Sequence, residues 1–99
     1  MTKNHNYFID LAFQIAQKNL GRTRLNPSVG TVIVKNDTVI SSAVTSFNGK
    51  PHSEFNALNN LKNCAGASLY TTLEPCTHYG ETPPCVSIII KKRIKNVFY

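Results

Sequence analysis

Apolar residues recur at helical spacing in the first part of the chain. Five of them recur at separations of three and four residues: Phe8, Leu11, Ala12, Ile15 and Ala16. This spacing lines one face of a helix and predicts one over about residues 4–19. Phe55, Leu58 and Leu61 predict a second helix over about residues 53–63. A third is expected over residues 85–92, directly after two prolines, because proline favours the first turn of a helix.

Four shorter segments, at 29–34, 38–45, 69–73 and 97–99, read as strands. Asn36 and Asp37 supply a turn between the first two, which therefore form a hairpin. The order helix, strand, strand, helix, strand, helix, strand predicts an α/β fold in which helices cover a mixed sheet. The last strand reaches the final residue with no turn after it, so we expect a fragment that is incomplete at its C-terminus.

Composition sets the scale of the molecule and its general class. With 99 residues, 41% of them apolar, the chain can form one core, so residues 1–99 are expected to be a single domain. Its longest apolar run, residues 86–90, is far shorter than the roughly 20 residues that cross a bilayer. The first residues do not resemble a secretion signal. We therefore expect no membrane association and a cytoplasmic location.

The formal net charge of +6 attracts anions such as nucleic acid or phosphorylated small molecules. Much of the excess comes from four residues near the end of the third predicted helix: Lys91, Lys92, Arg93 and Lys95. The simplest interpretation is a solvated helix end, where basic side chains also complement the helix dipole. Paired aromatic residues that could stack bases are not evident, so a nucleic-acid partner is disfavoured.

Three residues that bind zinc well occur in a restricted pattern: His52, Cys76 and Cys85. A catalytic zinc site commonly has three protein ligands and leaves the fourth position to water. Glu54 follows His52 by two residues, where it can act as a proton shuttle beside the metal. His-x-Glu followed by Pro-Cys and a second cysteine is typical of zinc deaminases, although eight residues separate these cysteines where two are usual. Cys64 has no such neighbours and is predicted to be an ordinary core or surface residue.

The segment TLEPCTHYGETPPC, residues 72–85, resembles the signature of the riboflavin-biosynthesis deaminases, including the long gap between the cysteines. Residues 26–30 and 49–54 also match that family, and the similarity runs from about residue 5 to the end. The resemblance implies a cytidine-deaminase-like three-layer α/β/α fold. It also implies hydrolytic deamination of a diaminopyrimidinone that carries a ribosylamino 5'-phosphate. The family's deaminase domain continues beyond residue 99, often into a reductase domain, and we expect both parts to be missing here.

Carried over position by position, the resemblance implies a Zn²⁺ ion held by the histidine and the two cysteines, and substrate contacts from Asn26 and His78. This chain departs from the family at two positions. Glu81 stands where many members have a basic residue, and its charge would repel a nearby phosphate. Thr45 stands where some members have a histidine, so it either binds the substrate or merely ends a strand.

In the expected mechanism zinc lowers the pKa of its bound water and Glu54 takes the proton as hydroxide forms. Glu54 then returns protons to the ring nitrogen and to the leaving amine. One alternative is a deaminase of another nucleoside, a free base or tRNA. A second is a non-catalytic zinc module, in which His78 would be the fourth ligand. A third is an inactive remnant. In every case an uncovered sheet edge would favour self-association into a homo-oligomer.

Overall fold

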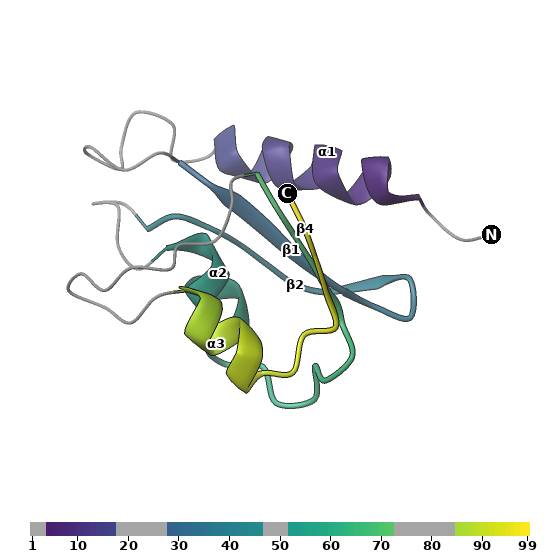
Figure 1. Ribbon diagram of the computed structural model, residues 1–99. Helices are drawn as coiled ribbons and strands as arrows, with labels where there is room; N and C mark the ends of the chain where they lie inside the picture. Colours follow the sequence, from purple (N-terminus) through teal and green to yellow (C-terminus); the bar gives the residue numbers. More distant parts are fainter. Residues whose placement is uncertain (1–3, 18–27, 47–51, 73–84) are drawn as a thin grey trace.

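In the part of the chain that the structure describes, four strands form one sheet, with a helix on one face and two helices on the other (Figure 1). The computed structural model describes residues 4–17, 28–46, 52–72 and 85–99. In chain order the elements are α1 His5–Ala16, β1 Gly30–Lys35, β2 Thr38–Val44, α2 Ser53–Leu58, β3 Ser68–Thr71, α3 Cys85–Lys91 and β4 Asn96–Phe98. Their order confirms the predicted α/β fold.

The strands lie in the order β2-β1-β3-β4. β1 pairs antiparallel with both β2 and β3, while β3 pairs parallel with β4, so the sheet is mixed as predicted. The hairpin turns at Asn36 and Asp37, whose φ angles of 53° and 63° are left-handed. Asn and Asp tolerate this region better than most residues because their short polar side chains can bond locally. The turn prediction is therefore confirmed.

Two apolar clusters, one on each face of the sheet, make up the core. On the α1 side lie Phe8, Ala12, Ile15, Val32, Val34 and Tyr70. On the side of α2 and α3 lie Ile33, Ala57, Leu58, Cys64, Ala67, Leu69 and Ile89. Successive residues of β1 point to opposite faces, so the strand contributes to both clusters. The three-layer α/β/α arrangement expected from the resemblance is confirmed.

The second helix is shorter than predicted: α2 ends at Leu58 and not near residue 63. Two asparagines follow it, and asparagine is a weak helix former. The Leu61 amide donates to the Leu58 carbonyl at 3.1 Å, which closes a tight turn. That turn directs Cys64 into the core, where it is 1% exposed. Cys64 is therefore a core residue.

The first helix was predicted to reach residue 19. In the structure α1 ends at Ala16, and residues 18 and 19 lie outside the described ranges.

The contact between α1 and the first residue of β1 is unusually close. A Cβ atom on Gly30 would lie 1.9 Å from the carbonyl oxygen of Ala12 and 2.8 Å from the amide nitrogen of Ala16. The Ser28 hydroxyl donates to the Ala16 carbonyl at 2.5 Å. The end of α1 and the start of β1 are thus fixed side by side, at a separation that requires glycine.

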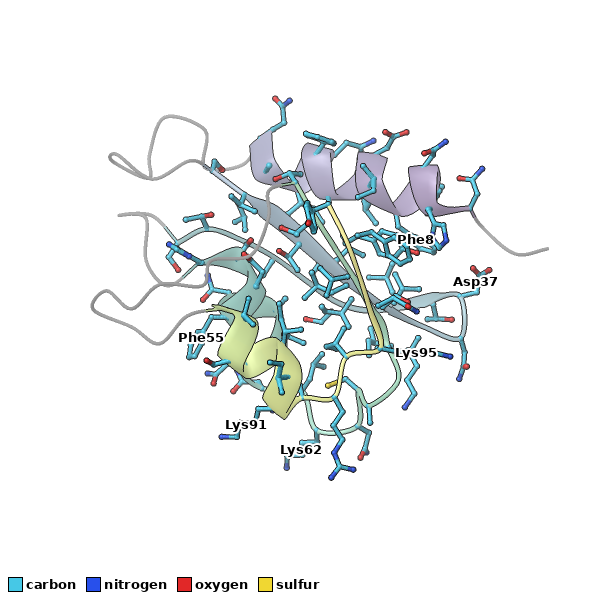
Figure 2. The ribbon with its side chains drawn as sticks, viewed as in Figure 1. Phe8, Asp37, Phe55, Lys62, Lys91 and Lys95 are labelled. Carbon is cyan, nitrogen blue, oxygen red and sulfur yellow. The ribbon has the colours of Figure 1, made fainter. Side chains whose placement is uncertain are left out.

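The lysine-rich segment lies at the C-terminal end of α3, as expected of a solvated helix end. Lys91, labelled in Figure 2, is exposed in the last turn of α3. Lys92 differs, because its ammonium group donates to the Leu61 carbonyl at 2.6 Å. In the described ranges, no helix is both long enough and apolar enough to cross a membrane.

Candidate functional site

His52 and Glu54 lie together at the start of α2. His52 is the N-cap residue, with extended backbone (φ −69°, ψ 163°), and its carbonyl accepts a hydrogen bond from the Asn56 amide at 3.0 Å. Its side chain is partly buried. Glu54 is in the first turn and is only 4% exposed. The helix start therefore presents an imidazole and a buried carboxylate two residues apart, as the sequence pattern predicts.

A chain of buried hydroxyl groups leads from the sheet to the Glu54 carboxylate. Ser53 Oγ donates to Glu54 Oε1 at 2.9 Å and lies 2.8 Å from Thr31 Oγ1. Thr31 in turn contacts the Thr71 hydroxyl at 3.3 Å. Each of these three hydroxyl residues is 0% exposed. The apolar core between α2 and the sheet thus ends in a hydrogen-bonded polar layer directly beneath Glu54.

This environment fits a carboxylate that faces a metal ion or a transferred proton. A buried carboxylate ordinarily requires a positive partner or several donors. In the described ranges the Glu54 carboxylate accepts one neutral hydrogen bond and forms no ion pair with Lys, Arg or His. The His52 imidazole beside it is a ligand type that zinc accepts. The donor set and the burial are therefore those expected at the edge of a zinc site.

The other predicted zinc ligands are described only in part. Cys85 is the first residue of α3, and the beginnings of α2 and α3 lie at the same end of the sheet (Figure 1). Cys76, His78, Asn26 and Glu81 lie outside the described ranges. Within the ranges that are described, no three His, Cys, Asp or Glu residues form a potential metal site, so the complete ligand set stays a prediction.

Thr45 lies one residue beyond the end of β2 and is 1% exposed. Its hydroxyl accepts a hydrogen bond from the Val29 amide at 2.9 Å, and its own amide donates to the Val29 carbonyl at 2.9 Å. The sequence alone left open whether this residue binds substrate or ends a strand. In the structure the Thr45 hydroxyl is hydrogen-bonded to the backbone of Val29, just before β1.

Sequence reasoning did not identify Thr31, Ser53 or Thr71 as neighbours of Glu54. Alternation along the strands could have placed both threonines on the face that α2 covers. Nothing in the sequence indicates that this helix start would lie above them, because the packing of α2 on the sheet brings Ser53 to Thr31, 22 positions away.

A separate cavity of about 440 Å³ lies between the start of α1 and the β1–β2 turn. Among the described residues its lining includes His5, Lys35, Asp37 and Tyr70, and no predicted site residue. It is therefore distinct from the end of the sheet where α2 begins.

Comparison with known proteins places the chain among deaminases. The family model described as the cytidine and deoxycytidylate deaminase zinc-binding region matches residues 2–99. The riboflavin biosynthesis protein RibD of Bacillus amyloliquefaciens is 43% identical over 93 residues, which cover 93% of this chain and 25% of that protein. A diaminohydroxyphosphoribosylamino-pyrimidine deaminase of Buchnera aphidicola is 39% identical over 92% of this chain and 63% of its own length.

The fold agrees with a solved structure as well. A diaminohydroxyphosphoribosylaminopyrimidine deaminase/5-amino-6-(5-phosphoribosylamino)uracil reductase from Thermotoga maritima superposes with a TM-score of 0.85 and is 40% identical, covering 92% of this chain and 27% of that one. The chain therefore spans about a quarter of the length of the RibD-type relatives that it matches. Since the family model covers all but the first residue, the chain belongs to the cytidine and deoxycytidylate deaminase family and constitutes its zinc-binding region.

Proposed function

We propose that this chain is a zinc-dependent deaminase domain that hydrolyses the amino group from a phosphoribosylamino pyrimidine in riboflavin biosynthesis. The observation that carries the proposal is the buried Glu54 carboxylate, which lies two residues after His52 and, among the described residues, accepts a single neutral hydrogen bond. The family membership and the names of the relatives at about 40% identity supply the substrate class.

His52, Cys76 and Cys85 are the residues proposed to hold zinc. When bound, the ion would supply a water molecule activated for attack on the ring carbon that carries the amino group. Glu54 accepts the two protons of that water in turn, and donates one to the ring nitrogen and the other to the departing amine. One water is consumed, ammonia leaves, and the ring carbon keeps a carbonyl oxygen. The burial of Glu54 supports this role, because exclusion of bulk water strengthens a carboxylate's interaction with a nearby cation.

Asn26 and His78 are proposed to contact the pyrimidine ring. An asparagine side chain can donate and accept hydrogen bonds at once, as a base edge requires. Glu81 does not suit a phosphate anchor because both groups are negative. Comparing kcat/KM for the nucleotide and for the same compound without its phosphate tests whether this chain uses the phosphate. Equal values would mean that the phosphate contributes nothing to binding.

A second candidate is deamination of a free base. The guanine deaminase of Bacillus subtilis has a solved structure with a TM-score of 0.74 and 29% identity over 98% of this chain. The higher identity to the riboflavin-pathway proteins favours the first candidate. Ammonia release from the diaminopyrimidinone nucleotide, guanine, cytidine and tRNA under the same conditions decides between them, because the correct substrate should show the highest kcat/KM.

The test of the catalytic residue is the substitution Glu54→Gln, measured for zinc content and for ammonia release. Gln is nearly isosteric with Glu but cannot carry the proton, so we expect turnover to fall by at least ~100-fold, the lower end of what general acid–base catalysis contributes. Zinc should remain at one ion per chain. Asp10→Asn, the same change at an exposed position on α1, is the matched control and should leave both quantities unchanged. Substantial ammonia release by the Glu54 variant would contradict the assignment, and all four zinc positions filled by protein would favour a structural zinc module.

A further inference from the structure

Beyond the points where the β-ladders on both sides of β1 end, threonine hydroxyls accept hydrogen bonds from the backbone. The β1–β2 ladder ends at the pair Gly30 and Val44, and the β1–β3 ladder ends one residue later on β1. Beyond these pairs, Thr45 Oγ1 accepts from the Val29 amide at 2.9 Å. On the other side, Thr72 Oγ1 accepts from the Gly30 amide at 3.3 Å. Two successive backbone N–H groups, of Val29 just before β1 and of Gly30 at its start, thus donate to hydroxyls that follow the two neighbouring strands.

Thr45 makes the tighter of these connections. It is bound to Val29 twice, through its own amide and through its hydroxyl, and is 1% exposed. A side chain so deeply buried leaves almost no surface for a ligand. Its hydroxyl instead satisfies a buried backbone N–H group, whose loss of a partner is costly. Geometry therefore argues for an action through the backbone and against direct contact with substrate.

The same end of β2 is also tied to α2, which carries His52 and Glu54. Asn56 Nδ2, one turn into α2, donates to the Val44 carbonyl at 3.0 Å and to Ser46 Oγ at 2.9 Å. Thr45 lies between these two acceptors. The segment 44–46 therefore joins the residues just before β1 to the helix that bears Glu54.

We propose that Thr45 is a positioning residue: its hydrogen bonds to Val29 fix the segment just before β1, which follows Asn26 in the sequence, relative to the start of α2. The inference rests on the proposed function, in which Asn26 contacts the pyrimidine. Because Thr45 acts on substrate placement and not on proton transfer, its loss should affect KM for the nucleotide more than kcat.

The decisive comparison is Thr45→Val against Thr45→Ser. Valine keeps the size and branching of threonine but removes the hydroxyl, whereas serine keeps the hydroxyl. We expect Thr45→Val to raise KM about tenfold, below the roughly 100-fold that a 1 Å misplacement can cost. The kcat value and the zinc content should stay near those of the parent chain. Thr45→Ser should restore KM, and Thr38→Val, at the exposed far end of β2, should leave it unchanged.

Amide hydrogen exchange at Val29 supplies a readout that does not depend on activity. The Val29 amide should exchange faster in Thr45→Val than in the parent chain or in Thr45→Ser, because its acceptor is gone. A raised KM with unchanged exchange would mean that Thr45 touches the substrate directly, which overturns the positioning role. Faster exchange with unchanged KM overturns it too. Absence of ammonia release from the parent chain would instead refute the proposed function, and the exchange comparison would then still test the hydrogen bond itself.

Discussion

Replacement of Gly30 by alanine should destabilise the protein more than any other single methyl group added to a described glycine. The new Cβ would lie 1.9 Å from the Ala12 carbonyl oxygen and 2.8 Å from the Ala16 amide nitrogen. Real Cβ atoms essentially never approach within 3.0 Å, so α1 must move away from β1 by on the order of 1 Å. Both obstructing atoms are backbone, and no side-chain rotation can relieve the overlap.

The expected cost follows from what α1 buries. Phe8, Ala12 and Ile15 pack against Val32 and Val34 on that face of the sheet, and a displaced helix loosens all of these contacts. Overpacking typically costs about 1–3 kcal/mol. Because the clash involves main-chain atoms, we expect the upper end, ~3 kcal/mol. For a domain of this size that corresponds to a fall in Tm of roughly 12–24 °C.

Urea unfolding of the parent chain and the variant, followed by circular dichroism, measures this difference. Gly66→Ala is the matched control. Gly66 has a left-handed φ of 83° with no atom within 4 Å of the added Cβ, so its substitution should cost only about 1 kcal/mol of backbone strain. If Gly30→Ala proved no more destabilising than Gly66→Ala, the close approach of α1 to β1 would be refuted.

Three further predictions concern stability. Burial, and secondarily the Asp37 carboxylate, raises the pKa of Tyr70 above 10.0. Because the pKa of Tyr70 is higher in the folded than in the unfolded state, its contribution to stability is complete below pH 10.0 and is lost as the pH rises through the folded-state pKa. The urea midpoint of the parent chain should therefore fall at alkaline pH, and the midpoint of Tyr70→Phe should depend less on pH. Leu58→Ala empties a fully buried position and should cost about 2–5 kcal/mol in urea unfolding; a loss below 1 kcal/mol would mean that the site is not packed as described. Thr31→Val removes the hydroxyl that supports Ser53 and should cost about 1–2 kcal/mol, with the exposed Thr38→Val as a near-neutral reference; equal effects of the two variants would argue against the buried hydroxyl chain.

Local patterns predicted most of the secondary structure because they depend on residues close together in the chain. Apolar spacing located α1, and Asn36 with Asp37 located the hairpin turn. The end of α2 was predicted too late because Leu61 continues the apolar spacing, although the backbone turns at Asn59. Periodicity cannot distinguish a helical residue from one that packs against the same core after a turn.

The candidate site likewise has some residues that the sequence predicts and some contacts that it does not. His52, Glu54 and the two cysteines were recognised from their residue types, order and spacing, which metal chemistry and proton transfer constrain strongly. The role of Thr45 was left open, because a threonine at a strand end is compatible with several functions. Its contact with Val29 became evident only when the two strands were seen side by side.

The sequence by itself determined the α/β class, the order of the elements and the candidate chemistry at the start of α2, because each follows from residue type and short-range spacing. Only the tertiary structure decided that the hydroxyls of Thr31 and Ser53 lie beneath Glu54, and that Gly30 touches the backbone of α1. Such contacts join residues 14 to 22 positions apart, and their geometry depends on how the helices pack on the sheet. The physical reason is that close packing and hydrogen bonding act between neighbours in space, which a linear pattern does not specify.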